Sequence, residues 1–175
     1  MHSRDADGPF PLGDADWLLA RRTVRRAVAT SLHCSIASTN ADGSAHVTPI
    51  GSVQLTGPGT GFYFDVFNCR LAENVDRDPR VTIAAVDSGA LMWLRSLLRG
   101  RFVRPPGVLL VGTVGPARAS TAAEQARFHR VLGPLVRTPG GRAMWGTLPR
   151  VRDLSVESIR PLRLGPMTGS GPSSR

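Results

Sequence analysis

Three residues at the end of an apolar segment could together bind an anion. In "FDVFNCRLAEN" the chain leaves a predicted strand at residues 64–67 and enters a predicted helix near Cys69. Asn68, Cys69 and Arg70 therefore stand at a helix N-terminus, where free N–H groups and the helix dipole favour negative charge. Arg70 adds a bidentate, charge-assisted donor. The pattern indicates a phosphate site; the alternative is that Asn68 only caps the helix and Arg70 is an ordinary surface charge.

A second group combines an aromatic side chain with two guanidinium groups. In "MWGTLPRVRDL", Trp145 precedes Arg150 and Arg152. An aromatic ring can stack on a flat ligand while arginines hold an acidic group. A core tryptophan followed by an arginine-rich strand explains the same residues equally well, so Arg150 and Arg152 are candidate substrate ligands with a structural alternative.

The third segment, "NADGSAHVTPIG", contains a turn at Asp42-Gly43 followed by a short strand. That strand includes Pro49, which cannot donate a ladder hydrogen bond and therefore belongs at a sheet edge or a bulge. The segment is either a hairpin corner or the wall of a site.

No side-chain constellation for catalysis or metal binding is evident in the sequence. The motifs of serine hydrolases, P-loop proteins, zinc proteases and dinucleotide-binding folds are absent, and the four histidines share no ligand spacing. Cys34 and Cys69 form neither a CxxC pair nor a disulfide framework. We therefore expect no catalytic side chain and no metal, and an enzyme of this kind would take its chemistry from a cofactor.

These residues need a scaffold, and the periodicity predicts a single α+β domain. Helices are expected over residues 14–29, 69–79 and 120–136, and strands over 31–39, 46–56, 61–67, 80–87, 107–119 and 151–165. Residues 137–150 are expected to form a loop, and residues 88–106 an inserted helix that either caps the barrel or contacts another subunit. Six strands in meander order without βαβ alternation favour a small antiparallel β-barrel with flanking helices. The expected boundaries are a flexible arm over 1–13, the domain over 14–165 and a disordered tail over 166–175.

The composition indicates a globular chain with an unusual basic set. The formal net charge is +9, and all 22 basic residues are arginine. The charges are scattered and lack interleaved aromatic residues, so nucleic acid is disfavoured and a solvated helix face is the better interpretation of "ARRTVRR". No apolar run is long enough to span a bilayer and no secretory signal is visible, which predicts a cytoplasmic location and no membrane partner.

The order of these segments resembles the pyridoxamine 5'-phosphate oxidase-like proteins, the family of FMN-binding split barrels. The resemblance rests on "SLHCSIASTNADGSAHVTPIG" followed by "GFYFDVFNCRLAENVDRDPRVTIAAVD". It covers residues 24–87 well and 107–163 loosely. It implies a six-stranded antiparallel split β-barrel with FMN as cofactor.

The resemblance also implies positions for the cofactor-binding residues, each taken over at the matching motif. The strand beside the flavin would contribute His46, Val47, Thr48, Pro49 and Ile50. Phe64 and Asp65 would lie near the ring, while Asn68, Cys69 and Arg70 would hold the phosphate. A homodimer with flavin sites at the interface is implied, in which Trp145 reaches the flavin of the other subunit.

One departure from the family concerns the substrate. The family ends with a W…R-L-H-D-R pattern, whereas this chain has Arg150-Val151-Arg152-Asp153-Leu154 after Trp145. Pyridoxamine phosphate is therefore disfavoured as substrate. The hypothesis is an FMN-dependent oxidoreductase that transfers hydride through flavin N5, with a small-molecule substrate or a nicotinamide donor. The alternatives are a deazaflavin cofactor, a binding module without turnover and, less favoured, a basic nucleic-acid-binding barrel; haem is disfavoured because no histidine is placed as an axial ligand.

Overall fold

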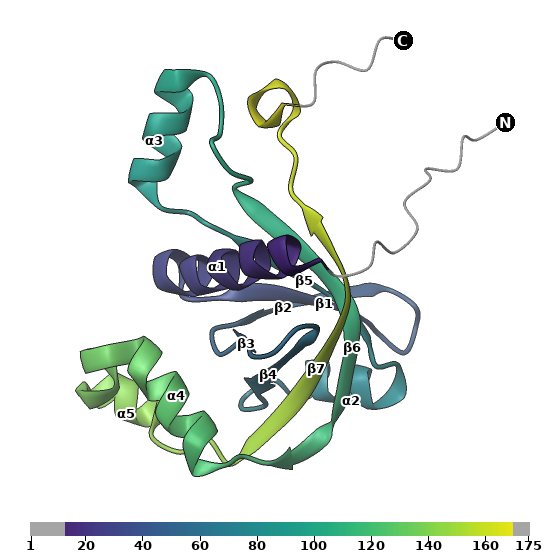
Figure 1. Ribbon diagram of the computed structural model, residues 1–175. Coiled ribbons are helices and arrows are strands. Elements are labelled where there is room, and N and C mark those ends of the chain that lie inside the picture. Colours follow the sequence, from purple (N-terminus) through teal and green to yellow (C-terminus); the bar gives the residue numbers. More distant parts are fainter. Residues whose placement is uncertain (1–12, 170–175) are drawn as a thin grey trace, which may run out of the picture.

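The structure is a computed structural model that describes residues 13–169. Figure 1 shows a curved antiparallel sheet with α1 across one side, α4 and α5 at one end, and α3 projecting beyond the other end. The helices are α1 (Asp14–Ser31), α2 (Cys69–Arg77), α3 (Ala90–Arg99), α4 (Ala122–Leu132) and α5 (Pro139–Trp145), with 3-10 helices η1 (Gly133–Arg137) and η2 (Gly165–Thr168). The strands are β1 (Cys34–Thr39), β2 (Ala45–Ile50), β3 (Gln54–Leu55), β4 (Thr60–Phe64), β5 (Arg80–Val86), β6 (Gly107–Ala119) and β7 (Arg150–Pro161).

The strands form one sheet in the order β2-β1-β5-β6-β7-β4-β3. Every neighbouring pair is antiparallel. The long pair β6–β7 has register shifts at Val111/Gly112 and Val114/Ala117, and such bulges bend and twist a strand. A Cβ at Gly112 would lie 2.0 Å from the Ser155 carbonyl oxygen, so only glycine allows this close approach.

Helix α1 closes the concave side of the sheet. Asp14 and Asp16 in its first turn complement the helix dipole. The residues that it buries recur at helical spacing and join the main core: Trp17, Ala20, Val24, Ala27 and Val28. A second, smaller core lies where α4 packs on β4 and β7, around Phe64, Phe128 and Leu132. The capping box expected from Thr121 and Glu124 is present.

The structure corrects the expected strand over residues 46–56, because two short strands replace it. A Cβ at Gly51 would lie 2.7 Å from the Leu32 carbonyl oxygen, so the chain turns here where a side chain would not fit. The Ser52 hydroxyl accepts a hydrogen bond from the Phe64 N–H at 3.0 Å. The chain then re-enters the sheet as β3 at the opposite edge, which gives seven strands and not the six expected.

Three further segments differ from the expectation. The expected loop over 137–150 contains α5, which begins with Pro139 and is capped by the Thr138 hydroxyl. Helix α3 stands away from the sheet and does not cap it (Figure 1). Residues 166–168, expected within a disordered tail, belong to η2, and the Phe102 N–H donates to the Met167 carbonyl at 2.7 Å. The expected arm (residues 1–12) and the last residues of the expected tail (170–175) lie outside the described residues.

Within residues 13–169, no helix combines the length and apolar character needed to cross a membrane.

Candidate functional site

Strand β2 is an edge strand, and within residues 13–169 it pairs with β1 alone. Pro49 lies opposite Ser35 of β1, and the edge position accommodates its missing N–H donor. Val47 and Pro49 are exposed, while His46 and Thr48 are half-buried and joined by a 2.8 Å contact between Thr48 Oγ1 and His46 Nε2. The strand therefore leaves one backbone edge and much of its side-chain surface open to a ligand or another chain.

The N-terminus of α2 lies in the segment expected to bind phosphate. The Asn68 side chain does not cap the helix; its amide donates instead to the Val66 carbonyl at 2.8 Å. The first N–H groups of α2 therefore have no side-chain cap, and the first turn contains no acidic residue. Cys69 is exposed, and the Arg70 side chain is 64% exposed.

Arg70 has only a weak partner among the described residues. Its guanidinium lies 3.8 Å from the exposed Glu73 carboxylate. It also faces the β1–β2 turn: hydrogen bonds from Ser44 chiefly lower the pKa of the Asp42 carboxyl, and Arg70 contributes a smaller part. The start of α2 therefore lies near enough to the β1–β2 turn for the charge of Arg70 to act on Asp42.

A pocket of about 200 Å³ lies between β2, the end of β4 and α5. It brings together five residues expected from the sequence, namely Pro49, Ile50, Phe64, Asn68 and Trp145. We call it the β2 pocket. Its walls are largely apolar and aromatic, with Ser52 and Asn68 as polar lining residues, and none of the described side chains that line it is titratable. Trp145 reaches this pocket from its own chain, through α5, which follows α4 and η1 in the sequence.

Phe67 is a lining residue that sequence reasoning missed. Its φ of 66° lies in the left-handed region, which a bulky residue rarely adopts. Its side chain is nevertheless 76% exposed. Strained backbone that presents an aromatic ring at a pocket is a feature of binding sites. No sequence signal marks it, because the strain comes from the turn between β4 and α2.

Two expected site residues are buried beneath this surface. Arg152 on β7 donates from Nε to the Asp65 carboxylate at 2.7 Å and from Nη1 to Asp76 at 2.6 Å. The Arg152 and Asp65 side chains are 4% and 3% exposed, and the Arg152 hydrogen bond lowers the pKa of Asp76. Arg152 and Asp65 therefore form an internal ion pair, whereas Arg150, two residues earlier, is exposed.

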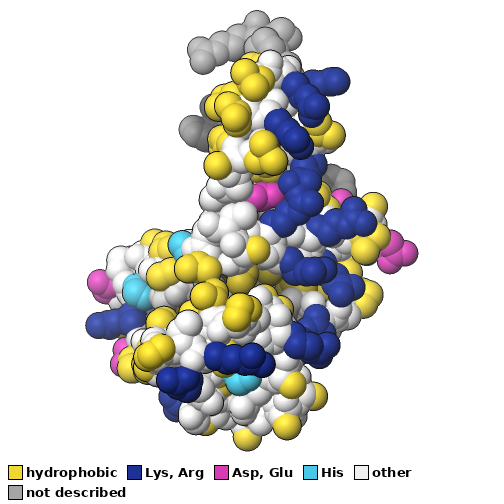
Figure 2. Space-filling view, turned by 90° about the vertical axis from the view of Figure 1, so that its left-hand side faces the viewer, with side chains coloured by type: hydrophobic (Ala, Val, Ile, Leu, Met, Phe, Trp, Pro, Cys, Tyr) yellow, Lys and Arg dark blue, Asp and Glu magenta, His cyan; other side chains and the backbone are white. Residues whose placement is uncertain are grey.

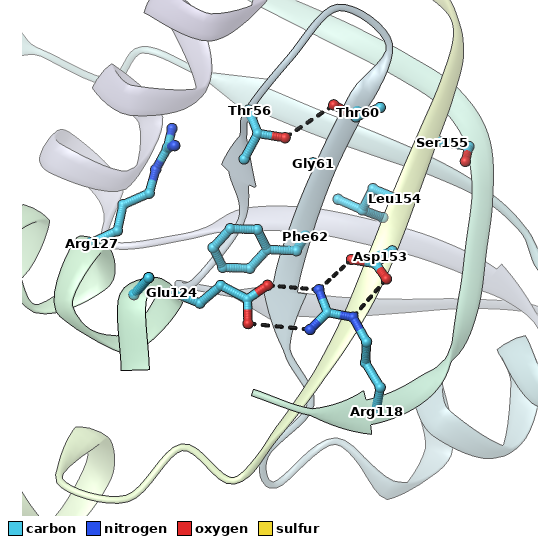
Figure 3. A pocket seen from close by; sticks show the side chains of 11 residues that line it. Thr56, Thr60, Gly61, Phe62, Arg118, Glu124, Arg127, Asp153, Leu154 and Ser155 are labelled. Carbon is cyan, nitrogen blue, oxygen red and sulfur yellow. Dashed lines mark hydrogen bonds and ion pairs between the residues drawn. The ribbon is translucent and has the colours of Figure 1, made fainter. Parts of the chain in front are cut away.

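A second arginine is also saturated by carboxylates, in a cavity of about 440 Å³ between α4 and the β4–β7 strands. Figure 3 shows the Arg118 guanidinium between Glu124 and Asp153. Both closest N–O distances are 2.6 Å. Arg118 lowers the pKa of Glu124 to about 2. Arg127 also lines this cavity, but its guanidinium donates to Gln54 Oε1 and the Leu55 carbonyl, so Arg118 is the lining arginine whose charge carboxylates balance.

A third cavity, the arginine groove, has the opposite character. It lies between α1 and α4 over β3 and encloses about 460 Å³. Its four basic residues are Arg21, Arg25, Arg127 and Arg130, and none of the described side chains that line it is acidic. Arg127 is positioned by hydrogen bonds to Gln54 Oε1 at 2.8 Å and the Leu55 carbonyl at 3.0 Å.

The groove also contains a buried donor without a partner. Since Oε1 of Gln54 accepts from Arg127, its Nε2 must be the donor, and this atom is buried with no hydrogen-bond partner among the described residues. An acceptor group in the groove would suit both this amide and the arginines. The groove adjoins the β2 pocket: Gly51 lines both, and Phe128 of the groove packs on Phe64 of the pocket, with ring centroids 5.4 Å apart.

A single curved antiparallel sheet with flanking helices is the architecture of the split-barrel proteins. The family model of pyridoxamine 5'-phosphate oxidase matches residues 20–162. The chain therefore belongs to the pyridoxamine 5'-phosphate oxidase-like family, and both the resemblance and the split-barrel fold expected from the sequence are confirmed. No curated protein matches the sequence.

Solved structures share this fold at low sequence identity. An FMN-binding protein from Syntrophomonas wolfei has a TM-score of 0.57 at 11% identity, over 86% of this chain and 90% of that chain. An F420 reductase has a TM-score of 0.51 at 15% identity, over 77% and 93%. HutZ, the heme storage protein from Vibrio cholerae, has a TM-score of 0.52 at 10% identity, over 81% and 94%. At these identities the likeness concerns the fold, and the residues must decide the ligand.

Proposed function

We propose that this chain binds FMN along β2 and is a flavin-dependent oxidoreductase. The observation that carries the proposal is the uncapped N-terminus of α2 with Arg70, next to the aromatic β2 pocket at an open sheet edge. The start of α2 with Arg70 suits a phosphate, and the β2 pocket suits a flat ring. The family contains flavin-binding proteins, which supports the same cofactor class.

The residues of the chain fit the parts of FMN. Backbone N–H groups at the start of α2 and the Arg70 guanidinium would hold the phosphate. Pro49, Phe67 and Trp145 would contact the ring, and unpaired backbone groups of β2 would reach its polar edge. A bound flavin would supply reversible hydride transfer at N5, which requires no acid or base from the protein. The protein would then contribute position, orientation and the exclusion of water.

The site also supports a homodimer. Pockets for drug-sized ligands measure about 300–1,000 Å³, so a pocket of about 200 Å³ holds only part of a flavin. Val47 on β2 is 59% exposed. A second copy packed against β2 would enlarge the site and cover this strand, so the complete flavin site would lie at a subunit interface.

The arginine groove is the better candidate for the substrate end of the site. Arg152, expected there from the sequence, is paired internally. The groove presents four arginines without a carboxylate, beside apolar walls and next to the β2 pocket. We propose that the substrate or electron donor carries an acidic group and places it here.

A binding module without turnover is the second candidate. It is supported by the fold, which this chain shares with the heme storage protein HutZ. Reduction of the bound flavin by a nicotinamide cofactor or a reduced deazaflavin would favour the enzyme. A flavin that no donor reduces would favour the module.

The test is the identity of the ligand that copurifies. Protein purified without added cofactor is denatured, and the released ligand is identified by absorption and mass spectrometry. We expect FMN, or a protein that takes up FMN stoichiometrically when titrated. Bound haem, a deazaflavin, or no uptake of FMN would each contradict the FMN proposal.

A further inference from the structure

Residues 88–106 form a projection that the flavin site does not use. The α3 arm, as we call this segment, consists of α3 and the connections that join it to β5 and β6. It extends past the end of the sheet, away from α4 and α5 (Figure 1). Its role is independent of the proposed function.

The arm has a fixed structure of its own. The Trp93 indole N–H donates to the Asp87 carbonyl at 2.8 Å, and the Trp93 and Phe102 rings make an edge contact with centroids 5.2 Å apart. Arg104 forms an ion pair with Asp87 at 2.9 Å, at the base of the arm. The arm is thus tied to the body through Asp87, and its outer surface is presented in one orientation.

The outer surface of the arm exposes more apolar area than is expected of a helix that faces water. Five large apolar side chains are exposed by 55–79%, namely Leu91, Leu94, Leu97, Leu98 and Val103. Leu91, Leu94 and Leu98 are spaced i, i+3 and i+7, which places them on one side of α3. In Figure 2 hydrophobic side chains gather on this projecting part of the molecule. Contiguous exposed apolar surface of this kind marks an interaction site.

The charge next to this surface is entirely positive. The arm contains four arginines and no acidic residue. Arg95, Arg99 and Arg101 are exposed, and within the described residues no carboxylate lies within ion-pair distance of them. Figure 2 shows arginine side chains beside the apolar patch and continuing down the same face of the body.

We propose that the α3 arm docks on an anionic lipid surface, with its leucines in the headgroup region and its arginines on the lipid phosphates. A helix with an apolar face and arginines beside it is typical of segments that lie in a membrane interface. Juxtaposed arginines gain further from anionic lipids. The expectation of no membrane partner rested on the lack of a spanning segment, which does not bear on a helix that lies on the surface.

The positive charge of the arm favours an anionic lipid surface over two other partners, a second copy of the chain and a nucleic acid. A second copy of this chain carries a net charge of +9, so an arm-to-arm contact would bring Arg95, Arg99 and Arg101 against the same three arginines of the other copy. Nucleic acid would complement the charge but leave the leucines in water, because single strands bind by stacking on aromatic side chains. An anionic lipid surface satisfies the leucines and the arginines together.

The test is cosedimentation of the full chain with vesicles. Vesicles of phosphatidylcholine and phosphatidylserine at roughly 7:3 are compared with phosphatidylcholine alone, at about 0.05 M and about 0.5 M salt. We expect binding to the anionic vesicles that weakens at high salt. Leu94→Gln/Leu98→Gln should lower the partition coefficient at least about tenfold, and Arg95→Gln/Arg99→Gln about tenfold at low salt only.

The matched control is Leu18→Gln/Leu135→Gln, since these leucines are 50% and 46% exposed but lie on α1 and η1. This control should bind vesicles as the unchanged chain does. The proposal fails if the unchanged chain does not bind anionic vesicles, or if both leucine pairs have the same effect. Conversion of a dimer to a monomer by the α3 pair, measured by light scattering, without vesicle binding by the unchanged chain, would assign the surface to a second copy.

Discussion

Two regions of the molecule treat charged groups in opposite ways. On the neighbouring strands β7 and β6, Arg152 is held by Asp65 and Asp76, and Arg118 by Glu124 and Asp153. Around β2 and the start of α2, the N–H groups of the helix have no side-chain cap, and among the described residues the carboxylate partner of Arg70 is a distant one, Glu73 at 3.8 Å.

The difference separates structural charges from charges available to a ligand. A buried guanidinium without its carboxylates would strongly destabilise the fold, so Arg152 has a structural role. An exposed guanidinium beside uncapped N–H groups is free to meet an anion from outside. The same residue type therefore has two roles, which depend on what surrounds it.

The largest expected effect is on the buried pair. Arg152→Met should lower the free energy of unfolding by about 3–5 kcal/mol, because it leaves the Asp65 carboxylate buried without a counter-charge. Urea denaturation measures the loss. The control Arg150→Met, at an exposed position two residues earlier, should change stability by less than about 0.5 kcal/mol. Equal losses in the two variants would show that the ion pair does not stabilise the fold. In the double variant Arg152→Met/Asp65→Asn, part of the lost free energy of unfolding should be recovered.

A smaller effect is expected at the open side of the split. Arg70→Ala should weaken FMN binding by about 1.5–3 kcal/mol, as for a lost hydrogen bond to a charged group, with little change in unfolding. Titration of flavin fluorescence measures the affinity. Arg160→Ala, an exposed arginine on β7, serves as the control and should bind FMN normally. An unchanged affinity in Arg70→Ala would take this residue out of the cofactor site.

Acid should weaken the Arg118 cluster in a defined pH range. Its guanidinium lowers the pKa of Glu124 from an ordinary 4.5 to about 2. Since the folded state favours the carboxylate, this contribution is complete above pH 4.5 and is lost as the pH falls towards 2. Glu124→Gln should cost at most about 1 kcal/mol at neutral pH and nothing near the lower limit, because the pair is partly exposed. The measurement is the free energy of unfolding of Glu124→Gln and of the unchanged chain as a function of pH. A difference between the two that stays constant with pH would contradict this prediction. Glu157→Gln is the control variant.

The smallest effect concerns the two thiols. Burial raises the pKa of Cys34 to about 12, so this thiol should not react in the folded protein at about pH 7. Cys69 is exposed at the start of α2, and should react with a disulfide reagent while bound FMN slows it. Mass spectrometry after brief labelling identifies the modified cysteine. Labelling of Cys34 at the same rate, or no protection of Cys69 by FMN, would count against this arrangement.

Much of the fold could be predicted because its signals are local. The burial period of α1, the Asp42-Gly43 turn and the capping box of Thr121 and Glu124 each depend on residues within a few positions. The division of the expected strand at Gly51 could not be predicted, since it depends on the carbonyl of Leu32, which lies distant in sequence. Helix α5 was not predicted, because its two glycines and its proline are typical of a loop.

The candidate site was predicted in part. Pro49, Ile50, Phe64, Asn68 and Trp145 meet in one pocket as expected. Phe67 was missed, because its exposure and positive φ depend on the turn that it occupies. The internal pairing of Arg152 was missed as well, since nothing near it in the sequence shows that Asp65 and Asp76 would reach it.

By itself the sequence determined the family, the order of the elements and the position of Asn68, Cys69 and Arg70 at the start of α2, because these depend on neighbouring residue types and on periodicity. Only the tertiary structure decided which arginines are neutralised and which remain open to a ligand. The physical reason is that a guanidinium finds its carboxylate across strands that are distant in sequence. The apolar face of α3 also became visible as a surface only in the structure, because burial of a leucine depends on residues distant in sequence, and Leu91, Leu94, Leu97 and Leu98 are exposed there.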